Sequence, residues 1–338
     1  MDTSAALGAI DSAAAAVPVQ PRFSEEATVI AAPTPTPKAP ARRPGRPPKQ
    51  KNNLVETLGV VAEPFNPLSY VEMVISNPTM FKKILSLHKA YAVSEVEIYF
   101  GLEDVRMKAK DHLGRTTIYT TFFGRMINIY YCKTPISIVV KREYLDHILG
   151  PPDKANHKIS IVLRENWRSS VYIIVKDMDY DKENIYDVEV IRASESEISY
   201  DGDVDTDHPL QFSFDSKHLK SEILKLSPLS KLLSIQKVDG KHLMFTGDNS
   251  TKPGYNGIYS NSEKIGMKNR LGAGHVFHIS VPIGYIKPFT SSCIGEHVTI
   301  AADPVKKISF TSGLDKKIDG QYGIEIKVFS DLYTVSRA

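Results

Sequence analysis

The chain has 338 residues, of which 42% are hydrophobic, so it is long enough and apolar enough to bury a sizeable core. Its formal net charge is only +3, so overall charge does not by itself indicate nucleic-acid binding. Two cysteines, Cys132 and Cys293, exclude a disulfide framework, and no apolar run reaches the length of a membrane span. We therefore expect an intracellular protein in a reducing compartment, with no membrane partner.

Residues 1–63 differ in composition from the rest of the chain. They are rich in alanine and then in proline and contain almost no aromatic residues, so we expect a disordered tail. The basic segment RRPGRPPK, which contains Arg43, Arg46 and Lys49, resembles an AT-hook, a Gly-Arg-Pro core that lies in a narrow minor groove. These three residues are candidate DNA contacts, although a nuclear-localisation signal or a flexible loading arm fits the same composition.

The segment from Pro78 to Ala92 predicts a short amphipathic helix with Pro78 in its first turn. Its apolar face consists of Phe81, Ile84, Leu85 and His88, and its polar face consists of Lys82, Lys83, Ser86 and Lys89. A solvated lysine face is the simplest interpretation of any one such helix. His88 on the apolar face is more typical of a core histidine than of a ligand.

Segments of alternating apolar and polar residues fill the rest of residues 64–192 and predict strands with one covered face. A second helix is expected within residues 140–150, with Lys141 and Arg142 at its start and Gly150 as a left-handed cap. Its apolar face would contain Tyr144, Leu145, Ile148 and Leu149. Residues 193–208 are acidic and are expected to form an extended connector.

The same plan returns in residues 209–338. The segment FSFDSKHLKSEILKLSPLSKLLSIQKV, residues 212–238, predicts a helix behind an Asp215 or Ser216 cap and then a strand. The helix would have Leu219, Ile223 and Leu226 inward and Lys217, Ser221 and Lys225 outward. Strands follow, including a single one over residues 257–265. A weaker helix is expected over residues 281–293, where Pro288 should kink or shorten it. The duplication predicts two similar α+β domains, each with an antiparallel sheet covered on one side by two helices.

Motifs for catalysis or metal binding are missing from the sequence. The DGDVDTDH segment resembles the start of a calcium loop, but Thr206 and Phe212 stand where such a loop needs Gly and Glu. Asp177, Asp179 and Asp181 fit a solvated turn better than a metal site. We therefore expect a binding or scaffold protein that is not an enzyme and needs no metal or cofactor.

The order and duplication of these segments resemble the DNA sliding clamps of the PCNA type, ring-shaped processivity factors for DNA polymerases. The resemblance rests on FKKILSLHK, on EVEIYFGLEDVRMKAKD with TTIYTTFF, and on the stretches from HLKSEILKL and from GYIKPFTSSC, and covers about residues 67–331. A basic tail ahead of such a body is similar to the clamp homologue of asfarvirus-like large DNA viruses. The resemblance implies a viral protein acting where viral or nuclear DNA is replicated, in the cytoplasm or the nucleus.

The resemblance also implies site residues and partners. Sequence-independent contacts to duplex DNA are expected from basic residues of the four helices: Lys82, Lys83, Lys89, Lys141, Arg142, Lys217, Lys220, Lys225 and Lys287. DNA polymerase and other replication or repair factors are expected to dock short peptide motifs in a pocket formed by Ile118, Ile198, Tyr200, Val305 and Val328. Lys110 stands where the family usually has an apolar residue beside this pocket.

Ring geometry predicts the number of subunits. If four helices per chain line a ring at a spacing of roughly 10 Å, a dimer leaves an opening of only about 15 Å, whereas a trimer leaves about 28 Å. A duplex is roughly 20 Å wide, so a homotrimer is the smallest ring that admits it. Two alternatives remain: a DNA-architectural or transcription protein that binds through the AT-hook, and a structural viral protein built from β-domains.

Overall fold

The computed structural model describes residues 66–75, 78–123, 127–150, 157–198, 210–237, 242–247, 255–260, 265–269, 278–292, 294–302, 307–314 and 324–331. The predicted tail, including Arg43, Arg46 and Lys49, lies outside these residues, as do Tyr200 and Val305. The calcium-like segment after Asp201 is also outside them up to residue 209.

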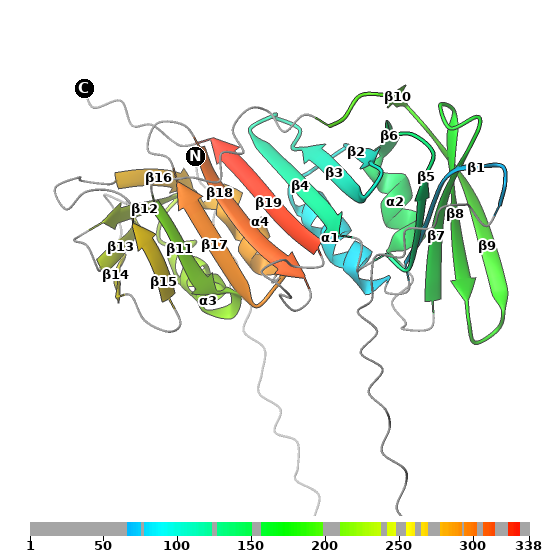
Figure 1. Cartoon of the computed structure of the whole chain (residues 1–338). Helices are drawn as coiled ribbons and strands as arrows, with labels where there is room; N and C mark the ends of the chain where they lie inside the picture. The colour runs from blue at the N-terminus through cyan, green and yellow to red at the C-terminus, as the bar shows by residue number, and fades with distance from the viewer. Residues whose placement is uncertain are drawn as a thin grey trace, which may run out of the picture. The chain divides into compact units, whose positions relative to one another are not determined.

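The first half of the described chain contains two helices and ten strands (Figure 1). In chain order they are β1 Ser69–Ile75, α1 Thr79–Ala90, β2 Glu95–Phe100, β3 Asp104–Lys110, β4 Thr116–Phe123, β5 Ile129–Cys132, β6 Ile136–Lys141, α2 Arg142–Leu149, β7 His157–Arg164, β8 Ser170–Asp177, β9 Lys182–Glu189 and β10 Arg192–Ser194.

The second half repeats this order as far as β9, with one helix after the first strand and another after five more strands. Its elements are β11 Leu210–Asp215, α3 Ser216–Leu226, β12 Leu232–Lys237, β13 His242–Gly247, β14 Tyr255–Ser260, β15 Ile265–Asn269, β16 His278–Pro282, α4 Ile283–Ser292, β17 His297–Ala302, β18 Lys307–Leu314 and β19 Ile324–Asp331. The duplication seen in the sequence is therefore a duplication of structure. The single strand expected over residues 257–265 is instead two, β14 and β15.

The strands form three antiparallel sheets. Five strands follow the order β5-β1-β7-β8-β9, four follow β14-β13-β12-β16, and ten follow β10-β6-β2-β3-β4-β19-β18-β17-β11-β15. The ten-stranded sheet joins the halves where β4 pairs with β19, from Phe122 opposite Ile324 to Thr116 opposite Ser330. The Thr116 and Ser330 hydroxyls lie 3.0 Å apart in this junction, so these two buried groups are paired.

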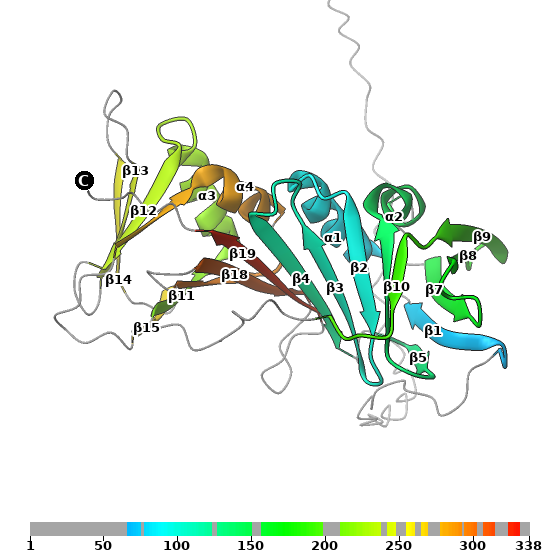
Figure 2. The same cartoon turned by 90° about the horizontal axis from the view of Figure 1, so that it is seen from above.

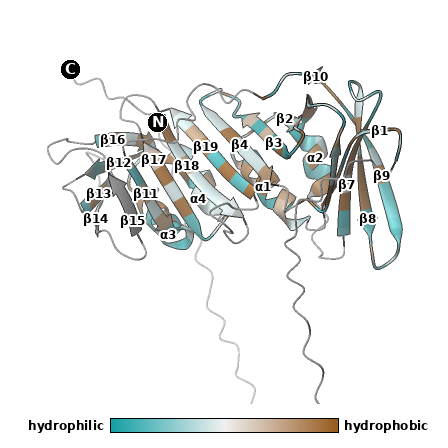
Figure 3. Ribbon diagram, viewed as in Figure 1, coloured by the Kyte–Doolittle hydropathy of each residue, from teal (hydrophilic) through white to brown (hydrophobic). Residues whose placement is uncertain are grey.

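The helices cover one face of the ten-stranded sheet, with α1 and α4 behind β4, β19 and β18 in Figure 1. Hydrophobic and hydrophilic bands alternate along these strands (Figure 3), as expected for a sheet with one covered face. Ile118, Val328 and Phe310 stand opposite one another on neighbouring strands and belong to a single core that spans both halves.

Two local expectations about α2 are wrong. Gly150 has φ −70° and ψ −45°, so α2 ends without a left-handed cap, and Tyr144 is 36% exposed rather than part of the apolar face. In the fourth helix, which was expected to be kinked or shortened at Pro288, the proline lies inside α4 and the helix continues to Ser292, so it is not shortened there.

Candidate nucleic-acid interface and partner site

The four helices form a layer in the order α2, α1, α4, α3 (Figure 2). Helix α1 contacts both α2 and α4, and α4 also contacts α3. At the central contact the Tyr91 hydroxyl donates a hydrogen bond to the Tyr285 carbonyl oxygen, which ties the end of α1 to α4. The layer is therefore continuous across the two halves of the chain.

Helix α1 presents a face of lysines. Phe81, Ile84, Leu85, Leu87 and His88 are buried against the sheet, and Lys82, Lys83 and Lys89 are exposed, as the sequence predicted. The helix contains no acidic residue. The charged residues on its exposed side are therefore all lysines.

One lysine of α3 and the lysine of α4 connect these two helices. Lys220 donates to the carbonyl oxygen of Ser291 at the end of α4 (3.2 Å), and Lys287 donates to the Ser227 hydroxyl at the end of α3 (3.1 Å). Both cations thus lie at the carbonyl end of a neighbouring helix, where the helix dipole favours positive charge. The expected cap of α3 is confirmed, because the Asp215 carboxylate accepts a hydrogen bond from the His218 amide.

Lys225 is paired with an acidic residue of its own helix. Its ammonium lies 2.7 Å from the carboxylate of Glu222, whose side chain is only 5% exposed. Lys217 is exposed at the start of the helix. The outward face of α3 is therefore less positive than that of α1.

Helix α2 contributes little net charge. Arg142 is half-buried and donates to the Val93 carbonyl oxygen (2.9 Å) and to Asp146 (3.0 Å), so it anchors α2 to the end of α1. Lys141 lies over the Tyr144 ring, 5.3 Å from its centre. With Glu143 and Asp146 on the same short helix, these cations are locally balanced.

His88 is the buried polar residue beneath the α1 lysine face. The side chain is fully buried, and neither ring nitrogen has a hydrogen-bond partner among the described residues. Burial, assisted by the positive charge of Arg142, lowers the pKa of His88 to about 3. His88 is therefore neutral at physiological pH and does not contribute to the positive charge of α1.

The opposite face of the ten-stranded sheet carries a second apolar cluster. We call it the outer cluster; its members are Tyr99, Tyr119, Phe329 and Ile198. Tyr119 and Phe329 pack edge to face at 5.6 Å. The first three come from strands β2, β4 and β19, and Ile198 comes from the segment that follows β10.

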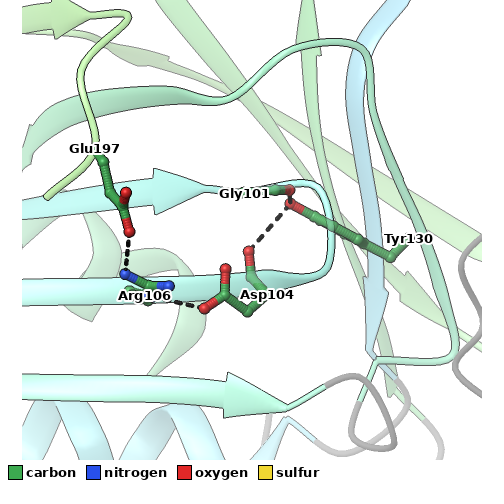
Figure 4. A network of polar contacts seen from close by, with 5 residues as sticks. All are labelled: Gly101, Asp104, Arg106, Tyr130 and Glu197. Carbon is green, nitrogen blue, oxygen red and sulfur yellow. Dashed lines mark hydrogen bonds and ion pairs between the residues drawn. The ribbon is translucent and has the colours of Figure 1, made fainter.

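Arg106 connects this segment to the sheet (Figure 4). Its guanidinium lies 2.5 Å from the Glu197 carboxylate, 2.6 Å from Asp104, and over the Tyr99 ring at 5.4 Å from the ring centre. The hairpin that carries Arg106 is held in turn by the buried Tyr130 hydroxyl, which donates to the Gly101 carbonyl oxygen. Burial raises the pKa of Tyr130, so this hydroxyl stays a donor.

The three predicted partner residues that the structure describes do not lie on one face of the sheet. Ile198 lies in the outer cluster, whereas Ile118 and Val328 have no exposed surface and belong to the core on the helix side of the sheet. Because side chains alternate along a strand, the outer positions belong to their neighbours Tyr119 and Phe329. Aromatic residues at otherwise polar positions of TTIYTTFF and GIEIKVFS were the sequence signal for this cluster.

The structure also bears on two other expectations. Among the described residues, no three His, Cys, Asp or Glu side chains gather into a group suited to a metal ion. No described helix has both the length and the apolar character to cross a bilayer.

No model of a known protein family matches the chain. The chain is 28% identical over 285 residues to an uncharacterized protein of African swine fever virus, in isolates from a tick in Malawi and a pig in Kenya. Each match covers 81% of this chain and 94% of the relative.

Among solved structures, the proliferating cellular nuclear antigen of Entamoeba histolytica superposes with a TM-score of 0.63. The superposition covers 79% of this chain and all of the other, at 11% identity. The fold is that of a PCNA-type clamp. The predicted α+β class and the two similar domains are thereby confirmed.

Proposed function

We propose that this protein is a non-enzymatic DNA sliding clamp of a large DNA virus, which encircles duplex DNA and tethers DNA polymerase and other replication and repair factors. The observation that carries the proposal is the exposed face of α1, whose charged residues are all lysines, in the middle of a continuous helix layer within a clamp fold. In a ring lined by these helices, Lys82, Lys83 and Lys89 would face the duplex.

Weak contacts suit this function better than tight ones. Phosphate contacts from scattered lysines give sequence-independent binding with a Kd on the order of 10⁻⁴ to 10⁻⁶ M at physiological salt. Closure of a ring converts such binding into retention by topology, while each contact still breaks quickly enough for sliding. The small net charge of +3 is compatible with this mechanism.

The sheet edges support assembly into a ring. Strand β9 is the edge of the five-stranded sheet and β14 is the edge of the four-stranded sheet, and each exposes one isoleucine, Ile185 and Ile258, at 64%. Unpaired edges with exposed apolar residues favour pairing with another chain. Head-to-tail pairing of β9 with β14 of the next subunit would cover both edges, and three subunits satisfy the ring geometry.

Assembly is tested by the mass of the full-length protein in solution and by negative-stain imaging. We expect a trimer with a central hole at micromolar concentration or in the presence of DNA. An Ile185→Lys variant should remain folded and become monomeric, whereas Ile174→Lys, next to it on β8 and away from the edge, provides a control for charge on the same sheet face. A wild-type protein that stays monomeric with and without DNA would overturn the ring.

Partners are proposed to dock on the outer face of the ten-stranded sheet, around the outer cluster and the start of the connector. This surface lies on the side of the sheet opposite the helices, so a docked partner would leave the helix layer free for DNA. The proposed contribution of Tyr200 and Val305 to this site falls outside the described residues.

A further inference from the structure

The outer cluster is already filled by the chain's own connector. Tyr99, Tyr119, Ile198 and Phe329 are 6%, 4%, 3% and 7% exposed, so these side chains offer no open apolar surface to a peptide. Ile198 is the one member that comes from outside the sheet strands. A partner that docks its apolar anchor here must therefore take the place of Ile198.

The outer face of the sheet contacts two neighbouring residues of the connector, Glu197 and Ile198. The Ile198 side chain packs on the aromatic rings, and the preceding Glu197 carboxylate lies 2.5 Å from Arg106. The position that Ile198 occupies on Tyr99, Tyr119 and Phe329 is called the seat. Arg106 is fixed by Asp104 and by stacking over Tyr99, so its guanidinium is held beside the seat. The surface is thus organised to bind a carboxylate next to a branched aliphatic side chain.

The segment is attached firmly before Glu197 and more weakly at it. Strand β10 pairs with β6 from Arg192 to Ser194, and the Ser137 hydroxyl donates to the Ser196 carbonyl oxygen at 3.0 Å. The Glu197 side chain is 59% exposed, and ion pairs exposed to this degree are weak. Release of Glu197 and Ile198 would therefore leave the rest of the segment in place.

We propose that the outer cluster is a peptide-docking site closed by Glu197 and Ile198, and that its partners carry an acidic residue directly before a branched aliphatic residue, with which they replace this pair. The inference rests on the proposed function of the chain as a clamp that tethers partners. It implies that the connector competes with every partner. The apparent affinity of a partner then equals its intrinsic affinity multiplied by the fraction of molecules in which Glu197 and Ile198 are released.

Competition is measured with a synthetic peptide that copies residues 193–200, ASESEISY, and with the full-length protein. We expect the peptide to bind the Ile198→Ala protein at least about tenfold more tightly than the wild type, because the seat has lost its own occupant. A Glu195→Gln protein, changed in the same segment at an exposed side chain that pairs with Arg168, is the control and should behave like the wild type.

Specificity is measured with two altered peptides on the Ile198→Ala protein. A peptide with Ile198→Ala should lose most of its binding, and a peptide with Glu197→Gln should bind several-fold more weakly than the parent. The Glu197→Gln penalty should disappear in an Arg106→Gln, Ile198→Ala double variant, which assigns the carboxylate to Arg106.

Equal affinity of the peptide for the wild-type and Ile198→Ala proteins would overturn the proposal, as would a peptide whose aliphatic residue is dispensable. If Ile198→Ala does not fold, a Glu197→Gln protein keeps the apolar contact and should give a smaller gain in affinity, and no gain would overturn the proposal. Trimer mass and DNA retention of the same proteins separate the two claims. A protein that forms no ring but gains peptide affinity refutes only the clamp, and the reverse result refutes only the docking site.

Discussion

Helices α1 and α3 occupy the same place in the two halves of the chain, but their lysines have different surroundings. Helix α1 exposes Lys82, Lys83 and Lys89 without an acidic residue and buries His88 without a described hydrogen bond. Helix α3 pairs Lys225 with the buried Glu222 and joins Lys220 to α4. The second helix therefore does not expose the same positive charge as the first, because Lys220 and Lys225 make contacts within the chain.

The largest effect is expected from changing Lys82, Lys83 and Lys89 together to Ala. The fold should persist, because these side chains point away from the core. Retention on closed circular DNA should fall at least several-fold, and the slope of log K against log salt should decrease by roughly 0.9 for each phosphate interaction that the substitutions remove.

The matched control removes the same charge from the outer face of the sheet. Lys108, Lys110 and Lys327 stand opposite Tyr119 or Thr117 on neighbouring strands, on the side away from the helices. Changing these three to Ala should leave retention unchanged. Equal losses in the two triple variants would show that α1 does not face DNA and would break the comparison.

His88 should make the protein sensitive to acid. Its pKa is about 3 in the folded chain against an ordinary value of 6.5, so below pH 6.5 the unfolded chain binds a proton that the folded chain does not. Its contribution to stability is therefore constant above pH 6.5 and is lost as pH falls towards 3, by about 2 kcal/mol at pH 5.

Denaturant unfolding at pH 7.5 and pH 5 measures this loss. His88→Leu should reduce the difference in the free energy of unfolding between the two pH values, because leucine has no titrating group. Leucine is chosen because the buried Leu226 ends the apolar stripe of α3. An unchanged pH dependence in this variant would assign the acid sensitivity to other groups.

Lys225 should affect stability more than DNA retention. Lys225→Ala leaves the Glu222 carboxylate buried without its lysine, and we expect a loss of about 1 kcal/mol in the free energy of unfolding, reduced by the exposure of the lysine. Adding Glu222→Gln should recover most of it. Lys217→Ala on the same helix should cost little, and a larger loss there would contradict the assigned role of Lys225.

The smallest effect is expected from deleting residues 1–60. Residues 38–51 contain basic residues and no acidic one, so the tail should attract phosphate. We expect ring assembly to be unchanged and the initial capture of DNA to be slower, most of all at low salt, where electrostatic attraction has the longest range. If the shortened chain captures both AT-rich and GC-rich duplexes as fast as the full chain does, at every salt concentration, a DNA role for the tail is excluded.

The sequence predicted the fold because its two halves repeat the same periodicities. The apolar stripes of α1 and α3 and the alternation of the strands were correct, and the Asp215 cap followed from its position. The end of α2 was not predictable, since Gly150 is compatible with both a left-handed and a right-handed conformation. Helix α4 continued through Pro288 because tertiary packing can outweigh local propensity.

The candidate sites were predicted less completely. Exposure of the α1 lysines follows from helical spacing alone. The bonds of Lys220, Lys287 and Arg142 connect segments far apart in the sequence or on different elements, so a pattern within one helix could not show them. Prediction of the partner residues depended on which face of each strand is directed outward. Neighbouring residues such as Ile118 and Tyr119 lie on opposite faces, so an error of one residue selects the wrong face.

The most direct test of the account is retention of the full-length protein on closed circular duplex DNA, followed by a single cut with a restriction enzyme. A ring around DNA predicts that the protein stays bound to the circle through a high-salt wash and leaves within the time needed to slide off once the circle is cut. Release from the intact circle at the same rate as from the linear form, at every salt concentration, would contradict encirclement.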